Sequence, residues 1–333
     1  MKTLRHLVTS LVILLGASVM IVFISGGQVV EPADETIIRF GHGSEESNER
    51  HLAVLHFKEL VENKSNGNIQ VQVYPNEQLG SEAEMIESVT LNDLQMVASS
   101  AFSQYDQRIS VFELPYLFSS YEEAWNVLDG KIGEKAAEPL LENNLRILSY
   151  FENGFRHVTS NQPIESPNDL NGLKIRTPES PLSLGTFKTL GANPTPMAFG
   201  ELYTALQQGT VDAQENPVAN IHSSKFQEVQ KYLNFTGHQY MPLPVAVSED
   251  FWQSLSPYSQ NIVKDSAQEA AQYHRDLIVK NEDKMVKELQ EDGMKVIEPD
   301  TEQFEKDTEM VYEHFKNEFG DEMVEEILQQ VKE

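Results

Sequence analysis

The sequence predicts two α/β domains, in which helices cover the faces of a mostly parallel β-sheet. Short strand-like segments alternate with amphipathic helical segments from residue 36 onward, and this alternation restarts near residue 153. A stretch from 258 to 292 contains neither proline nor glycine, which predicts one long helix. The chain has 333 residues, of which 40% are apolar and 23% charged, so it is long enough for two globular domains.

Residues 1–27 have the composition of an export signal. Lys2 and Arg5 precede an uncharged stretch from Leu7 to Val30, and the next charged residue is Glu31. Small residues near its end suit cleavage, and the stretch is also long enough to remain as an uncleaved membrane anchor. We therefore expect an exported protein, in the periplasm or on the outer face of the cytoplasmic membrane, with a cleaved signal peptide or an N-terminal anchor.

The remainder of the chain is strongly acidic. Without residues 1–27 it has 23 basic and 52 acidic side chains, a formal net charge of −29. Such a surface repels nucleic acid and anionic lipid headgroups, and it favours a soluble monomer. An anionic ligand would require local arginines to overcome this field. The absence of cysteine excludes disulfides and a lipid-bearing cysteine at the signal junction.

The first α/β segment begins at residue 36. Strands are predicted at Ile37–Phe40, Ile69–Tyr74 and Leu94–Ala98, where apolar residues cluster or alternate. Ser47 is positioned to cap a helix after the first strand, and the capping-box pattern Ser81–Glu84 begins a second helix. This order predicts parallel strands with helices on the faces of the sheet.

The middle of the chain continues with helices and then a second α/β segment. The pattern Ser120–Glu123 begins a helix that Gly130 ends, and another helix runs to about Asn144. Leu145–Phe151 returns as a strand, and the alternation restarts at Asn153. The elements predicted after this restart are strands at His157–Ser160, Leu173–Arg176 and Val211–Gln214, and a helix from about Leu182.

The C-terminal part is predicted to be helical. Ser256 can cap, and Pro257 can open, a helix that continues to Asp292, and we expect this helix to brace both domains. The last 53 residues carry 18 acidic and 6 basic side chains, with apolar residues at helical spacing. This pattern predicts helices with a solvated acidic face, and a partner-binding acidic tail is the alternative.

The usual enzyme signatures are absent from the sequence. It contains no Walker loop, no G-x-S-x-G, no H-E-x-x-H and no G-x-G-x-x-G motif. Gly41-His42-Gly43 follows a strand and precedes a helix, as an anion cradle would, but this signal alone is weak. The scattered histidines lack metal-ligand spacing. We therefore expect no enzyme activity, no cofactor and no metal site.

The segment from Glu152 to Asn220 contains specific motifs. They are ENGFRHVTSNQPI, SPNDLNGLKIRTPES and PTPMAFGELYTALQQGTVDAQENP. With these motifs the sequence resembles the solute receptors of tripartite ATP-independent periplasmic (TRAP) transporters, of the DctP type, over roughly 36–319. The segments Pro75–Gly80 (P-x-x-Q-L-G) and Leu114–Phe118 (L-P-Y-L-F) also match that family.

The resemblance implies which residues hold the ligand. In that family an arginine in G-x-R, a second arginine in L-K-I-R and an asparagine in Q-E-N-P meet around the ligand carboxylate. These positions are Arg156, Arg176 and Asn216 here, and Phe199 matches a pocket aromatic. Arg176 also ends a predicted strand, where α/β proteins bind ligands, and its planar guanidinium suits bidentate binding of a carboxylate.

Each of these residues also has a purely structural alternative. The two arginines could simply pair with acidic side chains, Asn216 could cap a helix before Pro217, and Phe199 could pack in the core. The first domain and the return crossing supply further cleft-facing candidates at strand ends or helix starts. These are His42, Asn48, Glu82, Ser99, His238 and Tyr240.

The resemblance implies a periplasmic-binding-protein-like fold, with two α/β domains, a hinge and a long C-terminal bridging helix. The expected domains are 36–153 plus 242–280, and 154–241 plus 281–333, the latter with the C-terminal helices. The implied function is to bind a small organic acid by its carboxylate and deliver it to the small and large integral membrane subunits of the transporter. A ligand-binding receptor for a signalling sensor kinase is the alternative.

The acidic residues expected in the first domain favour one ligand class. Glu45, Glu46, Glu49 and Glu82 are acidic, and Arg50 and Arg108 are the basic residues nearby. A C4-dicarboxylate would require another cation there, whereas a sugar acid would use acceptors for its hydroxyls. A sugar acid such as a uronate is therefore favoured over a C4-dicarboxylate.

Overall fold

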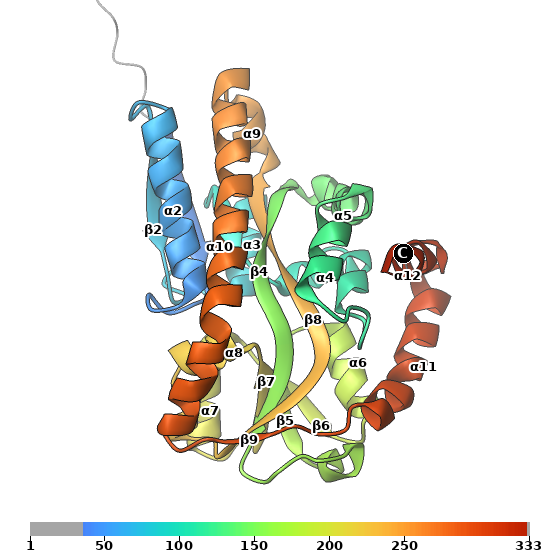
Figure 1. Ribbon diagram of the computed structural model, residues 1–333. Helices are drawn as coiled ribbons and strands as arrows, with labels where there is room; N and C mark the ends of the chain where they lie inside the picture. The colour runs from blue at the N-terminus through green and yellow to red at the C-terminus, as the bar shows by residue number, and fades with distance from the viewer. Residues whose placement is uncertain (1–35, 332–333) are drawn as a thin grey trace, which may run out of the picture. The chain divides into compact units, whose positions relative to one another are not determined.

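The computed structural model describes residues 36–331 (Figure 1). The predicted signal peptide or anchor at 1–27 lies outside these residues. None of the helices in 36–331 is long and apolar enough to cross a membrane.

One mixed sheet organises these residues, in the order β2-β1-β3-β8-β4-β7-β5-β6, with β9 paired to β8. Strand β1 is parallel to β2 and β3, and β5 is parallel to β6 and β7. The predicted α/β class is therefore confirmed, with antiparallel pairs only where β4 and β8 take part. The strands are β1 (Thr36–His42), β2 (Ile69–Tyr74), β3 (Met96–Ala98), β4 (Leu145–Ser160), β5 (Lys174–Thr177), β6 (Asn193–Pro196), β7 (Ala213–Asn216), β8 (Tyr232–Ser248) and β9 (Lys295–Ile297).

Strands β4 and β8 run through the whole sheet and join its two ends. They pair antiparallel from Leu145 opposite Ser248 to Ser160 opposite Tyr232. The prediction of two separate strands on either side of Asn153 is wrong, because β4 continues through this point with register shifts. We call β2, β1 and β3 the first half of the sheet, and β7, β5 and β6 the second half.

Eleven α-helices surround the sheet within the described residues, together with six short 3-10 helices. The α-helices are α2 (Glu49–Lys64), α3 (Glu82–Thr90), α4 (Tyr121–Leu128), α5 (Lys131–Ala137), α6 (Pro181–Thr189), α7 (Leu202–Gln207), α8 (Val218–Ser223), α9 (Glu249–Ser254), α10 (Pro257–Glu291), α11 (Glu302–Phe319) and α12 (Glu322–Val331).

Side-chain caps define where several of these helices begin. The capping box at Ser81 is confirmed, since its hydroxyl accepts from the Glu84 N–H and the Glu84 carboxylate accepts from the Ser81 N–H. The predicted cap at Ser47 is wrong, because the next residue, Asn48, caps α2 by accepting from the Arg50 N–H at 2.9 Å. Serine and asparagine are both good caps, and the sequence pattern does not distinguish between such neighbours.

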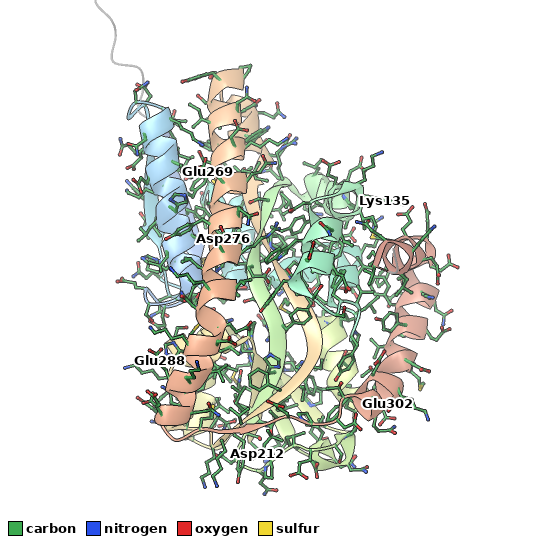
Figure 2. All side chains as sticks on the ribbon, viewed as in Figure 1. Lys135, Asp212, Glu269, Asp276, Glu288 and Glu302 are labelled. Carbon is green, nitrogen blue, oxygen red and sulfur yellow. The ribbon has the colours of Figure 1, made fainter. Side chains whose placement is uncertain are left out.

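Helix α10 confirms the predicted long helix and packs against β4, α2 and α8 (Figure 1). Ser256 caps it and Pro257 opens it. Its Ala267 lies in the core cluster beside β1 and α2, and its Leu289 lies in the cluster around α7 and α8. Acidic side chains project from its outer surface and are labelled in Figure 2: Glu269, Asp276 and Glu288.

Helices α11 and α12 confirm the predicted C-terminal helices. Phe315 and Ile327 are buried in a cluster that also contains Phe118 and Leu128. The acidic residues of both helices are largely exposed, as expected for a solvated acidic face.

Candidate functional site

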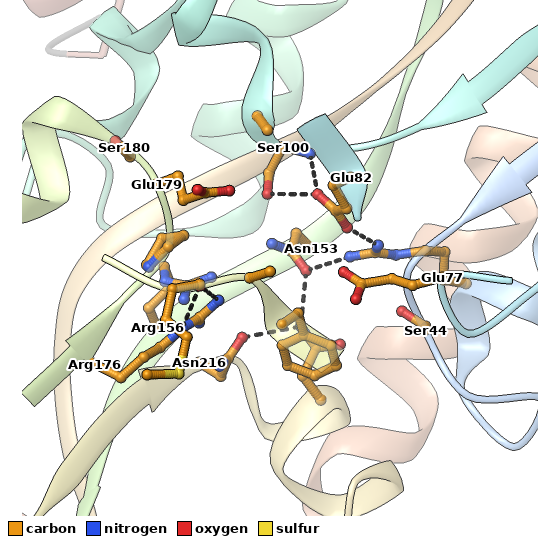
Figure 3. A pocket seen from close by; sticks show the side chains of 17 residues that line it. Ser44, Glu77, Glu82, Ser100, Asn153, Arg156, Arg176, Glu179, Ser180 and Asn216 are labelled. Atoms are coloured by element: carbon orange, nitrogen blue, oxygen red, sulfur yellow. Dashed lines mark hydrogen bonds and ion pairs between the residues drawn. The ribbon is translucent and has the colours of Figure 1, made fainter. Parts of the chain in front are cut away.

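A cavity lies where the two halves of the sheet meet, and its lining comes from both (Figure 3). About 560 Å³ of space at this site is not occupied by atoms, and part of it is open to solvent. The residues that carry the argument below are Ser44, Arg50, Glu77, Glu82 and Ser100 from the first half, and Asn153, Arg156, Arg176, Glu179, Phe199, Asn216 and Asn220 from β4 and the second half.

Arg176 is a buried cation without a carboxylate partner. It lies on β5, is 3% exposed, and donates from Nε and Nη2 to the Met197 carbonyl at 2.9 and 2.6 Å. Its guanidinium lies over the Phe199 ring, 5.9 Å from the centroid. It forms no ion pair with any carboxylate of 36–331, and burial lowers its pKa to about 10. The nearby charges of Glu215, Glu82 and Glu77 offset part of this burial cost, and a bound anion would relieve more of it.

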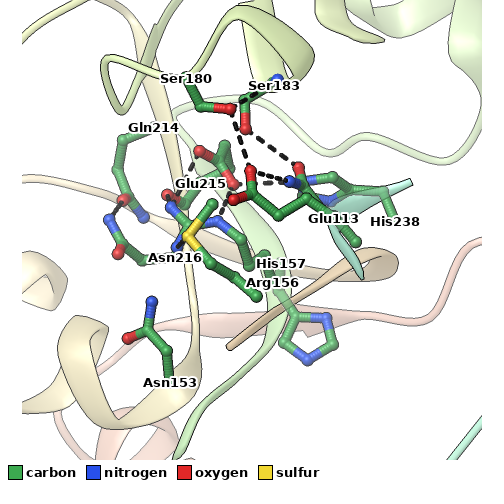
Figure 4. A network of polar contacts seen from close by, with 12 residues as sticks. Glu113, Asn153, Arg156, His157, Ser180, Ser183, Gln214, Glu215, Asn216 and His238 are labelled. Carbon is green, nitrogen blue, oxygen red and sulfur yellow. Dashed lines mark hydrogen bonds and ion pairs between the residues drawn. The ribbon is translucent and has the colours of Figure 1, made fainter. Parts of the chain in front are cut away.

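Arg156 also lines the cavity, but its charge is already paired (Figure 4). Its Nη2 donates to Oε1 and to the carbonyl of Glu215 at 2.9 and 2.7 Å, and its Nε donates to Oε2. His238 Nε2 lies 3.2 Å from the same carboxylate. Burial opposes ionisation of Glu215, yet Arg156 lowers the pKa of Glu215 to about 2. The sequence analysis gave pairing with an acidic side chain as the structural alternative for this arginine. Arg156 forms such a pair, with Glu215.

Asn216 ends β7 and begins a chain of amides that crosses between the halves. Its Oδ1 accepts from Asn220 Nδ2 at 3.2 Å, and that nitrogen also donates to Asn153 Oδ1 at 3.2 Å. Arg50, on α2, donates to Asn153 Oδ1 at 3.1 Å. The alternative that Asn216 caps a helix is wrong, because the cap position of α8 is Pro217.

Glu82 and Arg50 form the corresponding pair in the first half. Arg50 Nη1 lies 2.6 Å from Glu82 Oε1, and Glu82 Oε2 accepts from Ser99 Oγ and the Ser100 N–H, each at 2.9 Å. Burial alone would raise the pKa of Glu82, but Arg50 and these donors hold it below its ordinary value. Both charges of this pair are therefore compensated.

Glu77 extends from the loop between β2 and α3 to the second half. Its Oε2 accepts from the Gly200 N–H at 3.0 Å, whereas Oε1 is buried without a hydrogen-bond partner among residues 36–331. Burial, followed by the charge of Glu82, raises the pKa of Glu77 to about 7. The sequence analysis did not identify this residue.

The structure places five of the ten predicted site residues on the cavity wall. These are Arg156, Arg176, Phe199, Asn216 and Glu82. Phe199 also packs against the core cluster around α7, so its structural alternative holds as well.

The other five predicted residues are buried outside the lining and make contacts of their own. His42 Nε2 lies 3.1 Å from His51 Nδ1, Asn48 donates to Asn220 Oδ1 at 3.1 Å, and Ser99 donates to Glu82. His238 contacts Glu215, and the Tyr240 hydroxyl donates to Glu152 at 3.0 Å. Asn48 and Ser99 therefore contact lining residues directly, and His42 accepts from the Ser44 N–H, whereas His238 reaches Arg156 only through Glu215.

Sequence reasoning missed lining residues that only the tertiary structure brings together. Arg50 follows Asn48 by two positions and had been noted only as a basic residue near the cleft, while Asn153 lies where a break was expected in β4. Asn153 directly precedes the G-x-R motif that ends at Arg156. Since Arg156 was already a site candidate, this proximity was a usable signal for Asn153.

Comparisons with known proteins agree with this architecture. The family model described as bacterial extracellular solute-binding protein, family 7 (DctP), matches residues 40–318. The 2,3-diketo-L-gulonate-binding periplasmic protein of Escherichia coli (strain K12) is 38% identical over 263 residues, which cover 78% of this chain and 80% of that protein.

Solved structures are similar over most of the chain. A TRAP periplasmic solute-binding protein from Polaromonas sp. JS666, bound to D-erythronate, has a TM-score of 0.86 and 38% identity, covering 88% of this chain and 98% of that one. One from Sulfurospirillum deleyianum, with bound succinate, has a TM-score of 0.84 and 29% identity, covering 88% and 98%.

Proposed function

The chain belongs to the DctP family of bacterial extracellular solute-binding proteins, and from this premise we propose that it is the extracytoplasmic receptor of a TRAP transporter. Members of this family bind solutes and are not enzymes, and relatives are named as periplasmic proteins. The ligand is a small organic acid held by its carboxylate, either a sugar acid or a C4-dicarboxylate, as in the structures with D-erythronate and succinate.

The observation that carries this proposal is that the buried charge of Arg176 has no ion-pair partner among residues 36–331. Its Nη1 makes no hydrogen bond within 36–331, so this nitrogen can donate to a ligand carboxylate. The Phe199 ring lies against this guanidinium. We assign capture of the carboxylate to Arg176, additional positive potential to Arg156, and orientation to Asn216. Such charge-assisted hydrogen bonds are about twice as strong as neutral ones.

The way the site is assembled supports a closing mechanism. Its lining comes from both halves, and Arg50, Asn48 and Glu77 bridge them. We propose that 36–153 plus 242–280 and 154–241 plus 281–333 move as two domains that close over the ligand. The closed form would then deliver the ligand to the small and large membrane subunits of the transporter.

Ligand-dependent thermal stability tests the proposal. The exported protein, from residue 28, would be unfolded and refolded to remove carried-over ligand and then heated with uronates, aldonates, C4-dicarboxylates or keto acids. A ligand at 100 times its Kd stabilises the folded state by about 2.7 kcal/mol. We expect one acid class to raise the Tm of the wild type and of the control Arg108→Ala, which removes an exposed arginine, but not of Arg176→Ala. No rise with any acid would overturn the carboxylate site.

A further inference from the structure

We propose that Glu77 selects among organic acids by accepting a hydrogen bond from a ligand hydroxyl and repelling a second carboxylate, so that the site favours a polyhydroxy monocarboxylate over a C4-dicarboxylate. This inference rests on the proposed function, because it requires Arg176 to hold the ligand carboxylate. Figure 3 shows Glu77 and Arg176 among the side chains around the cavity.

The first argument is an acceptor without a donor. Glu77 Oε1 is buried at the cavity, and no donor of the described residues lies within hydrogen-bond distance of it, although the Glu82 N–H lies near the same carboxyl. Buried polar atoms in native proteins are nearly always partnered, so an exception in a ligand cavity marks a position that a ligand group can complete. Since a carboxylate oxygen accepts hydrogen bonds, the complementary ligand group is a donor such as a hydroxyl.

The second argument is that Glu77 is held in position. Its Oε2 accepts from Gly200 across the cavity at 3.0 Å, and a Cβ at position 200 would collide with this oxygen. Both Asn76 and Glu77 adopt the left-handed backbone conformation, with φ of 53° and 54°. The N–H groups of these two residues donate to the carbonyls of Ser44 and His42. Left-handed backbone at a non-glycine residue carries strain, and such strain concentrates at functional sites.

The third argument is the balance of charge around the cavity. Arg50 pairs with Glu82 and Arg156 pairs with Glu215, which leaves Arg176 as the unpaired guanidinium of the lining. One unpaired cation matches one ligand carboxylate. A second carboxylate would lie near the negative charges of Glu77 and Glu82 without a cation of its own. The raised pKa of Glu77 reflects its burial and the charge of Glu82.

A purely structural role for Glu77 makes a different prediction. If it served only to join the two halves through Gly200, its replacement would weaken every ligand by a similar factor. The ratio of affinities for two ligand classes separates this role from selection.

Isothermal titration would measure that ratio for the tightest-binding aldonate or uronate and for succinate. At a pH well above the raised pKa of Glu77, Glu77→Gln replaces an ionised acceptor by a neutral amide. We therefore expect the affinity for the hydroxy acid to fall at least about tenfold at that pH, as for loss of a hydrogen bond to a charged group. The affinity for succinate should stay equal or rise. Glu201→Gln is the matched control, because it removes the same charge from an exposed residue next to Gly200 that does not line the cavity.

A second variant, Gly200→Ala, keeps the charge of Glu77 but changes the position of its carboxylate. Gly200→Ala should displace the Glu77 carboxylate and lower the ratio of hydroxy-acid to succinate affinity in the same direction, even if Glu77→Gln fails to fold. Suppose that the ratio of hydroxy-acid to succinate affinity is unchanged in the folded variants, while Arg176→Ala still loses both ligands. This result would overturn the proposed role of Glu77 and leave the carboxylate site at Arg176 intact. A wild type that prefers succinate would also overturn it. If the wild type binds no acid, the proposed function itself fails.

Discussion

The guanidinium of Arg156 and the carboxylate of Glu215 form a buried, bidentate pair between strands β4 and β7, at the edge of the cavity. The same guanidinium donates to the Glu215 carbonyl at 2.7 Å, so it is fixed by side chain and backbone together. This pair distinguishes Arg156 from Arg176, although the sequence motifs predict the same role for both. One is compensated within the protein, and the other, Arg176, has its charge available for a ligand.

Removing both partners of the buried pair should cost less than the two single removals added together. We expect Glu215→Ala to lower the free energy of unfolding by about 3–5 kcal/mol, because it leaves the Arg156 charge buried and unpaired. Arg156→Met combined with Glu215→Ala should cost clearly less than the sum of the single changes. Urea unfolding of all four proteins gives the coupling energy, and strict additivity would contradict this account.

Arg176→Met should stabilise the ligand-free protein while abolishing ligand binding. Burial lowers the pKa of Arg176 to about 10, which means that the charged form is penalised in the folded state. Removing that penalty should raise the free energy of unfolding by up to about 3 kcal/mol, less the cost of unpairing the Met197 carbonyl. Urea unfolding without ligand and titration with ligand test both parts. A marked loss of stability would show that Arg176 is primarily structural.

Glu113→Gln should change the pH dependence of stability. Burial raises the pKa of Glu113 to about 7 from an ordinary value of 4.5, so the folded state holds this proton more tightly than the unfolded state. Its contribution is complete below pH 4.5 and is lost as the pH rises through 7. The variant should therefore gain up to about 3 kcal/mol relative to the wild type between pH 5 and pH 8.

Unfolding by urea at these two pH values measures the change. The other buried carboxyls are identical in both proteins, so they cancel in the comparison. An equal difference between variant and wild type at pH 5 and pH 8 would be evidence that Glu113 titrates normally.

Gly154→Ala should be costly because the backbone at this register shift in β4 requires glycine. Gly154 has φ of 114°, and a Cβ there would lie 3.3 Å from the Tyr121 hydroxyl and 3.4 Å from Pro217 Cβ. We expect a loss of about 2–3 kcal/mol in the free energy of unfolding. Gly209→Ala is the control, since φ is 69° with no atom within 4 Å, and it should cost about 1 kcal/mol. Equal losses would argue against crowding at position 154.

Asn48→Asp should loosen the contact between the halves while keeping the cap of α2. Asn48 Oδ1 accepts from the Arg50 N–H, whereas its Nδ2 donates to Asn220 Oδ1 at 3.1 Å and to Ser223 Oγ at 3.0 Å on α8. Aspartate keeps the acceptor and loses the donor. We expect a larger radius of gyration without ligand by small-angle scattering and about tenfold weaker ligand binding. Unchanged scattering and affinity would show that these bonds do not favour closure.

Local signals predicted much of the fold. Apolar alternation located β1 and β2, the capping box at Ser81 located α3, and the Ser256-Pro257 pair located the start of α10. These features succeed because each depends on residues a few positions apart. Strand β4 was split wrongly because Gly154 and its polar neighbours interrupt the apolar pattern, whereas its continuity depends on β8, far along the chain.

The candidate site was predictable where a residue's role follows from its own element. Arg176 lies near the end of a short strand, and this position alone directs it to the crevice of an α/β sheet. The neutralisation of Arg156 by Glu215 required knowing which strands pair. Glu77 required two consecutive left-handed residues and a contact with Gly200, and no periodic pattern encodes either.

The way β8 closes the sheet also sets the order in which the chain can fold. Met96 of β3 pairs with Val247, 151 residues later, and α2 packs against α10. A chain that leaves a ribosome or a translocation channel N-terminus first must therefore release most of its length before the first three strands gain their remaining neighbour. The first half of the sheet therefore stays incomplete until β8 has emerged, whereas β7, β5 and β6 need only β4, which precedes them in the chain. In an exported chain this order delays the completion of the sheet until most of the protein has crossed the membrane.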